Sequence, residues 1–158
     1  MKNNNNDDTT NSAKQSHPRH KQRLGVLIAA AAGIVATFLP WIHAPIIGSV
    51  SGTQGDGWIT LILFLPAVIL CLSGDSTKPI KGGKRLGTVI PSLIASLIGA
   101  YKIADFKSIK SSMNEGMEDN PFAEMFASTV QIGIGLYLLI AAGVAVAVLA
   151  WALDKKHK

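Results

Sequence analysis

His43 and Asp56 are the two side chains of this 158-residue chain that are best suited to chemistry, and a glycine-rich segment lies between them. A histidine beside a carboxylate can act as a base with its orienting partner. Glycines at positions 48, 52, 55 and 57 allow tight turns, or a row of backbone N–H groups that binds an anion. The candidate residues for interaction in this outer loop are His43, Gly52, Gly55, Asp56 and Trp58.

The segment matches no established catalytic or nucleotide-binding motif. Its Gly-x-x-Gly-x-Gly spacing reverses the dinucleotide fingerprint, and no lysine follows it as in a P-loop. Val50 stands where a nucleophile elbow needs serine. The simpler interpretation is structural: Asp56 caps the helix that follows, and Trp58 anchors that helix at a membrane interface. Contact with a ligand or a partner is the alternative use of the same loop.

The rest of the chain offers no set of catalytic residues. Cys71 is the single cysteine, which leaves no internal disulfide and no cysteine-based metal site to expect. We expect Cys71 to be a small buried side chain. The sequence therefore predicts no enzyme activity, no metal and no cofactor. His43 and Asp56 within hydrogen-bond reach of each other would reopen the question of an enzyme.

Four apolar stretches must position these residues, and they are Leu24–Ile42, Trp58–Leu72, Leu86–Ala104 and Ala127–Leu153. Such blocks exceed what one small soluble core can bury, and they suit the hydrocarbon interior of a bilayer. We predict one all-α domain over residues 24–153, an integral membrane bundle of four transmembrane helices. Ser49-Val50-Ser51 could serve as a signal-peptide cleavage site, but the first stretch is long for a signal peptide, and we expect an uncleaved helix.

The lysines and arginines distinguish the two sides of the membrane. Twelve of the fifteen lie in the predicted disordered tail (residues 1–23), in the second connection and in the C-terminal tail (residues 154–158). The other three, Lys102, Lys107 and Lys110, lie between the third and fourth stretches. The positive-inside rule then places both termini in the cytoplasm. Because topology and attraction to the lipid bilayer explain the basic excess, we expect no nucleic-acid partner.

Small residues recur at multiples of four along two of the stretches. They are candidates for close helix packing, and comprise Gly25, Ala29 and Gly33 in the first stretch and Gly87, Ala95 and Gly99 in the third. Helices in lipid associate through such residues because their backbones can approach closely. We expect contacts within the bundle, with another membrane protein or a homo-oligomer as the alternative partner.

Pro66 and Pro91 lie inside the second and third stretches, where they form static kinks or open a polar cavity. A water-filled cavity would indicate a small transporter or channel component, and the residues expected to line it are Ser92, Ser96, Gln131 and Tyr137. In a dry bundle we expect Gln131 to bond to a neighbouring helix. A serine of the third helix would then bond to the hydroxyl of Tyr137.

The third connection is the longest, and it is predicted to form an outer helical hairpin over about residues 105–126. The third helix continues into this hairpin and Asn114–Asn120 form a turn. The fourth helix begins near Pro121 and runs to about Leu153. Aromatic residues mark the membrane interfaces, with Trp151 on the inner side and Trp41, Trp58 and Tyr101 on the outer side.

Leu39-Pro40-Trp41, followed by Gly48-Ser49-Val50-Ser51-Gly52-Thr53-x-Gly55-Asp56-Gly57-Trp58, resembles a pattern of small bacterial membrane proteins of about four spans. The resemblance covers the first span, its loop and the start of the second span. It implies a bacterial inner-membrane location, and it brings no established activity and no catalytic residues.

Together these features predict a small non-enzymatic multi-pass membrane protein with an accessory, regulatory or interaction role. The outer loops would make the contacts, and immunity-type protection of the membrane against a toxin is one such role. A small transporter or channel component is the alternative.

Overall fold

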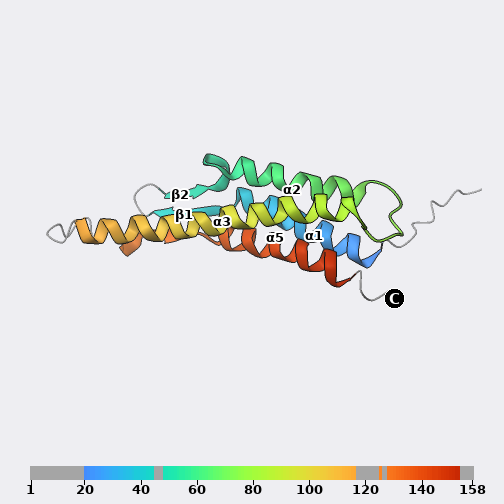
Figure 1. The fold of residues 1–158 in the computed structure, drawn as a ribbon. Helices are drawn as coiled ribbons and strands as arrows, with labels where there is room; N and C mark the ends of the chain where they lie inside the picture. Colours follow the sequence, from blue (N-terminus) through green and yellow to red (C-terminus); the bar gives the residue numbers. More distant parts are fainter. Residues whose placement is uncertain (1–19, 45–47, 117–124, 126–127, 154–158) are drawn as a thin grey trace, which may run out of the picture.

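Four helices make up most of the described chain, which comprises residues 20–44, 48–116, 125 and 128–153 of the computed structural model. They are α1 (Lys21–Phe38), α2 (Gly57–Leu72), α3 (Gly83–Gly116) and α5 (Ile134–Ala152). Each helix packs against two others, in the ring α1, α2, α3, α5, and successive helices run in opposite directions (Figure 1). The start of α1 and the end of α5 therefore lie at the same end of the bundle.

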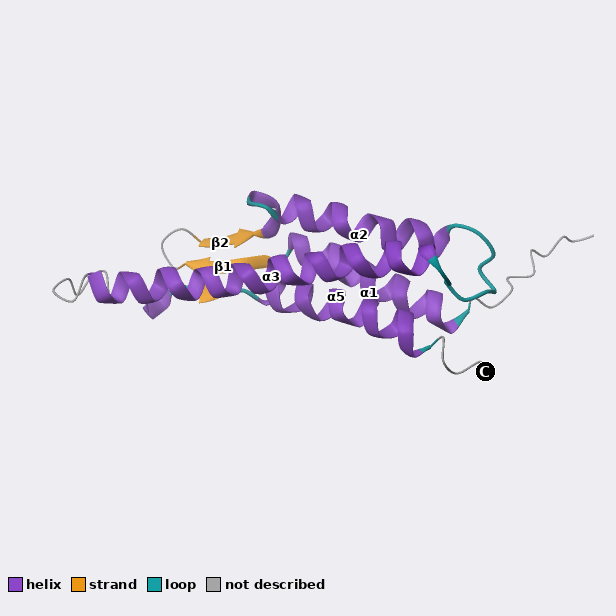
Figure 2. Cartoon of the chain, viewed as in Figure 1, coloured by secondary structure: helices purple, strands orange, loops and turns teal. Residues whose placement is uncertain are grey.

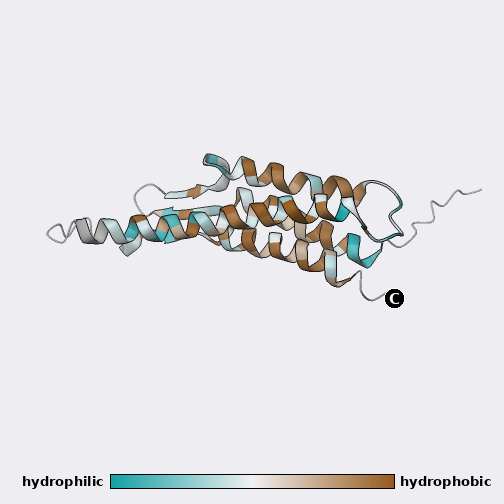
Figure 3. Cartoon of the chain, in the orientation of Figure 1, coloured by the Kyte–Doolittle hydropathy of each residue, from teal (hydrophilic) through white to brown (hydrophobic). Residues whose placement is uncertain are grey.

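The outer surface of the bundle is apolar. By length and composition α1, α3 and α5 can cross a membrane, α3 through its segment Gly83–Ser112, and α2 is a shorter apolar helix of 16 residues. Large side chains point outwards from the helices: Ile28, Ile62 and Leu97 are 62%, 60% and 68% exposed. Figure 3 shows apolar residues along the bundle and hydrophilic ones towards its ends. Such a surface is unfavourable in water and suits contact with lipid.

Glycines lie where neighbouring helices approach each other. The predicted packing glycines each face a side chain of another helix: Gly25 faces Leu149, Gly33 faces Phe64, Gly87 faces Leu70 and Gly99 faces Leu139. A Cβ on Gly33 would lie 2.5 Å from the Phe64 ring, so only glycine fits there without a shift. Ala29 and Ala95, the remaining two, are buried. These small residues lie within one bundle, where they allow close backbone approach.

The prediction for the fourth helix is wrong in its first turns. A continuous helix over residues 127–153 is not formed, because Gln131–Ile132 form strand β3 before α5 begins. The N–H of Gly133 then donates to the carbonyl of Trp41 at 2.7 Å. The local sequence, Thr-Val-Gln-Ile-Gly over residues 129–133, is rich in β-branched residues, which together with glycine favour extended backbone over helix.

The third helix is longer than its predicted span. α3 has 34 residues, about 51 Å at 1.5 Å per residue, and its last turns extend well past the start of α2 (Figure 1). It continues through Gly116, so the predicted turn over residues 114–120 is helical in its first part. Residues 117–124 and 126–127, which hold the predicted start of the fourth helix and much of the predicted hairpin, lie outside the described residues.

A three-stranded antiparallel sheet covers the end of the bundle where α1 ends and α5 begins (Figure 2). β1 (Pro40–Ala44) lies between β2 (Gly48–Ser51) and β3, and Ile42 pairs with Val50 on one side and Ile132 on the other. We call this sheet, together with the 3-10 turn η1 (Gly52–Gln54), the cap. The all-α prediction omits the sheet, because strands this short with partners distant in the chain leave little periodic signal.

The opposite end, where α1 and α3 begin, is here called the basic end, and among the described residues it carries Lys21, Arg23, Lys78, Lys81, Lys84 and Arg85. Gln22 is fully buried there: its Nε2 donates to Ala150 O at 2.7 Å, and its Oε1 accepts from the N–H of Ile80 at 2.8 Å. These bonds satisfy backbone groups that no helix pairs. The predicted disordered tail over residues 1–23 is therefore wrong for residues 20–23, and residues 1–19 lie outside the described chain.

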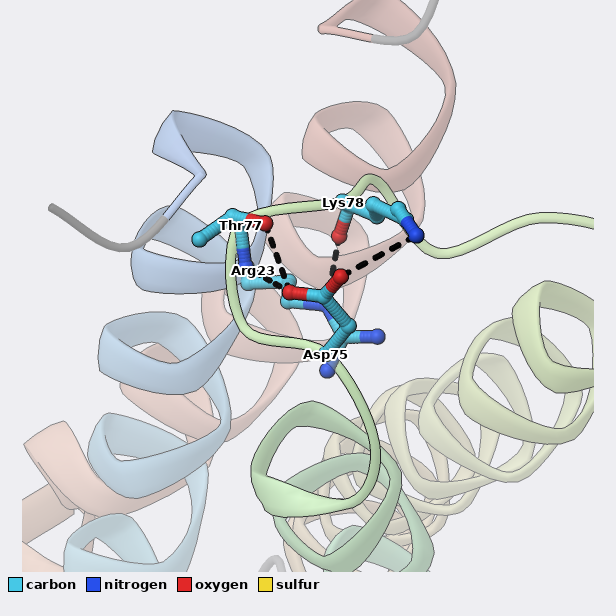
Figure 4. A network of polar contacts seen from close by, with 4 residues as sticks. All are labelled: Arg23, Asp75, Thr77 and Lys78. Atoms are coloured by element: carbon cyan, nitrogen blue, oxygen red, sulfur yellow. Dashed lines mark hydrogen bonds and ion pairs between the residues drawn. The ribbon is translucent and has the colours of Figure 1, made fainter. Parts of the chain in front are cut away.

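Arg23 ties the α2–α3 loop to α1 (Figure 4). Its Nε donates to Lys78 O at 2.7 Å, and its Nη1 donates to Cys71 O at 3.0 Å and to Ser73 O at 2.9 Å. Its side chain is only 5% exposed. A buried guanidinium that supplies several donors to carbonyls is a geometry that lysine cannot reproduce.

Asp75 orders the exposed part of the same loop (Figure 4). Its Oδ1 accepts from Thr77 Oγ1 at 2.6 Å and from the Thr77 N–H at 3.0 Å, while Oδ2 lies 3.2 Å from Lys78 Nζ. The hydroxyl bond from Thr77, followed by the Thr77 N–H and Lys78, lowers the pKa of Asp75 to about 2.

Candidate functional site

Trp41 holds the cap on the bundle. The pairing of β1 with β2 is irregular between Pro40 and Ile42, at the position of Trp41. Irregularities of this kind change the direction of a side chain. The indole is 7% exposed, and its Nε1 donates to Ala36 O of α1 at 3.0 Å. The prediction that Trp41 marks the membrane interface is therefore wrong, because its ring is packed between the cap and the helices.

Glycines surround Trp41 and shape the cap. A Cβ on Gly52 would meet the Trp41 ring and Thr37 O, and a Cβ on Gly135 would lie 2.7 Å from Trp41 Cδ1. A Cβ on Gly57 would likewise meet the backbone of Gly52. Gly52, predicted as an interaction residue, is buried and serves to pack the loop against α1.

Gly55, Asp56 and Trp58 lie at the start of α2. The N–H of Gly55 donates to Gly52 O at 3.0 Å, which closes the 3-10 turn. Asp56 occupies the N-cap position of α2 but makes no side-chain cap bond. Its carboxylate instead pairs with Lys102 of α3, with Oδ2 2.5 Å from Nζ. Trp58 is 55% exposed and its Nε1 donates to Thr53 O at 3.0 Å, so its ring remains available at the surface.

His43 lies in the middle of a polar row that crosses the sheet. It pairs with Ser49 of β2 on one side and with Gln131 of β3 on the other, and all three residues are exposed. With Ala44, Gly48 and Thr129 they line an open cleft of about 380 Å³. We call Ser49, His43 and Gln131 the polar row.

The polar row offers hydrogen-bond donors and acceptors. They come from imidazole, hydroxyl and amide groups, and the lining that the structure describes includes no carboxylate or thiol beside His43. Asp56, the predicted partner of His43, makes its ion pair with Lys102 instead. Within the described part of the chain, no three His, Cys, Asp or Glu side chains come together as metal ligands would. The cleft therefore suits recognition of a polar group.

Sequence reasoning missed two members of the cleft. No binding role is predicted for Ser49, and Gln131 is predicted to bond to a neighbouring helix or to line a cavity. Gln131 is exposed because it lies in β3 rather than in a helix. The alternation of β-branched residues around it was the signal that could have indicated a strand.

The four residues expected to line a transport cavity do not meet in one. Ser92 and Ser96 are buried, and they donate to Thr88 O and Ile140 O, each at 2.9 Å. Tyr137 is 53% exposed, and Gln131 belongs to the polar row. The predicted bond between Tyr137 and a serine of α3 is therefore wrong: the serine hydroxyls bond to carbonyls.

Cys71 is a free cysteine, and it is 4% exposed near the end of α2. Its carbonyl accepts a hydrogen bond from Arg23, so this part of α2 is tied to α1. Burial of this kind keeps the thiol from solvent.

Comparison of the chain with models of protein families, with curated proteins and with solved structures found no match.

Proposed function

We propose that this protein is a non-enzymatic multi-pass protein of the bacterial cell membrane that binds a partner protein through the polar row of its cap. The observation that carries the proposal is the row itself, three exposed hydrogen-bonding side chains side by side over a cleft of about 380 Å³. The strands that carry the row are held to the bundle by Trp41 and the glycines around it. A rigid platform of this kind lowers the entropic cost of binding.

The proposed topology has four spans with both termini in the cytoplasm. All described lysines and arginines except Lys102, Lys107 and Lys110 lie at the basic end, as the positive-inside rule expects for a cytoplasmic face. In this topology the short helix α2 also crosses the membrane. Its 16 residues measure about 24 Å, and the exposed Trp58 at its start extends the apolar length into the interface. The cap then faces the outside of the cell.

An accessory or regulatory role follows from this arrangement, with immunity-type protection as one form of it. The polar cleft and the exposed Trp58 both belong to the cap end of the bundle. Protein-binding surfaces likewise combine aromatic anchors with hydrogen-bonding groups. The transporter alternative has less support, because Ser92 and Ser96 are bonded to carbonyls where α3 packs on Gly143.

Site-specific photo-crosslinking in native membranes tests this proposal. A photoreactive amino acid at Ser49 should give one discrete protein adduct, and the adduct should be lost when His43→Ala and Gln131→Ala are added. The same amino acid at the lipid-facing Leu97 is the control and should give no such adduct. The absence of an adduct at Ser49, or an adduct that persists without His43 and Gln131, would overturn the proposal.

A further inference from the structure

Two cations converge on one glycine at the basic end. Gly74, in the loop after α2, has φ +82°, and a Cβ built on it would lie 3.5 Å from Lys84 Nζ and 4.0 Å from Arg23 Nη2. Both nitrogens therefore lie near the same point, where glycine has no side chain. One phosphate group could bond to both, because a charge-assisted N–H···O bond spans about 2.8 Å.

Arg23 keeps one donor group for such a ligand. Its Nε and Nη1 bond to the carbonyls of Cys71, Ser73 and Lys78, and among the described residues its Nη2 has no hydrogen-bond partner. The side chain is 95% buried, so the bonds to the loop hold Nη2 in place beside Lys84. Lys84 is exposed and can adjust its position to a ligand.

Basic residues gather at the start of α3 in the part of the chain that the structure describes. The first turn of α3 contains no acidic residue and carries Lys84 and Arg85, although the positive end of a helix dipole favours negative charge. Asp75, the acidic residue that the described chain places at this end, is already bonded to Thr77 and Lys78. The helix dipole and Lys84 together favour an anion at this position.

The position of the site indicates which anion. Ile69, Leu72 and Leu86 lie close to it in the chain and are 56%, 55% and 50% exposed, so the apolar surface of the bundle ends at this level. Arg85 stacks on Trp151, 4.2 Å from the ring centroid, as amphipathic residues do at a membrane interface. Phospholipid phosphates occupy this depth of a bilayer.

We propose that Arg23 and Lys84 form, over Gly74, a binding site for the phosphate of an anionic phospholipid in the leaflet at the basic end. Arg23 supplies a hydrogen-bond donor that its bonds to the protein hold in position, and Lys84 supplies a second donor on an exposed side chain. The site lies at the opposite end of the bundle from the polar row, so its failure would leave the crosslinking result at Ser49 unchanged.

Native mass spectrometry of the full-length protein from phosphatidylcholine nanodiscs with a minor fraction of phosphatidylglycerol tests the site. The discs are held at 0.5 M salt, where the Debye length is about 4 Å and long-range attraction is screened. We expect retained phosphatidylglycerol on the wild type and about tenfold weaker retention in Lys84→Gln, as for the loss of one charged hydrogen bond. Lys81→Gln, which removes the same charge from a neighbouring exposed position, should change retention less than twofold.

Two results would overturn the proposal. Equal losses in Lys84→Gln and Lys81→Gln would show diffuse attraction to anionic lipid rather than a site. Displacement of phosphatidylglycerol by millimolar inorganic phosphate would assign the site to a soluble phosphate instead of a lipid. Because both lysines are exposed, both variants should keep the thermal unfolding midpoint of the wild type, which checks the fold.

Discussion

Trp41 and the backbone around it leave no room for a side chain at Gly52. Adding one methyl group there therefore tests how closely the cap packs on the bundle. In Gly52→Ala the new Cβ would meet the Trp41 ring and the carbonyl of Thr37, and a backbone atom cannot move aside as a side chain does. We expect a loss of about 1–3 kcal/mol in the free energy of unfolding, typical of overpacking. The measurement is thermal unfolding of the detergent-purified protein.

Gly83→Ala is the control for this change. No atom lies within 4 Å of a Cβ built on Gly83, which is exposed in the first turn of α3. We expect this variant to keep or slightly raise the free energy of unfolding, because alanine suits a helix better than glycine. Equal destabilisation by the two substitutions would contradict the packing role assigned to Gly52.

Asp75 provides a prediction about pH at the basic end. Since its pKa is lowered from 3.8 to about 2, its ionised form favours the folded loop above pH 3.8, and this contribution is lost as the pH falls through about 2. The bond from the Thr77 hydroxyl is the largest cause, so Thr77→Val should raise the pKa of Asp75 towards 3.8, whereas Thr77→Ser should not. Carbon-13 NMR titration of the Asp75 carboxyl measures this, and an unchanged pKa in Thr77→Val would contradict the assignment.

At the scale of the elements, the contact between α3 and α5 depends on Gly143. A Cβ there would meet Ser96 Oγ and Ser92 O, so Gly143→Ala should push the two helices apart and lower the unfolding free energy by about 1–3 kcal/mol. Ala141→Leu adds more volume on the exposed side of α5 and should change it by less than about 0.5 kcal/mol. If Gly143→Ala left the thermal midpoint unchanged, the proposed close packing would be wrong.

The helices could be predicted from the sequence better than the cap. Long apolar stretches indicate helices of membrane-spanning length whatever their partners, and α1, α3 and most of α5 lie where such stretches occur. The strands depend on pairing between β1 and β3, almost ninety residues apart in the sequence, which no local pattern encodes. For the same reason His43 could be recognised as a candidate from its type, whereas its neighbours Ser49 and Gln131 could not.

Predictions from local sequence were also wrong where a contact with another part of the fold determines the position of a side chain. Trp41 follows a helix end and suits an interfacial anchor, yet its indole bonds to Ala36 O and is buried under the cap. Arg23 belongs to a polar tail by composition, but it satisfies three carbonyls at the end of α2 and in the loop after it, some fifty residues away. In both cases the partner is a backbone carbonyl, which carries no sequence signature.

At the scale of the whole molecule, the two ends of one bundle are specialised differently. The cap end offers neutral hydrogen-bonding groups on a sheet, and the basic end offers clustered cations at the level where the apolar surface stops. Both proposals need the bundle to cross the membrane with all four helices. Whether α2 crosses the membrane decides the topology, because α2 is the shortest of the four helices.

Thiol labelling in right-side-out membrane vesicles tests that topology most directly. Cysteines are introduced one at a time at Ser49 and Lys81, which flank α2 and are exposed, in a Cys71→Ala background. A membrane-impermeant maleimide should label Ser49→Cys in sealed vesicles and Lys81→Cys only after permeabilisation. Labelling of both positions in sealed vesicles, or of Lys81→Cys alone, would contradict a four-span bundle with its cap outside.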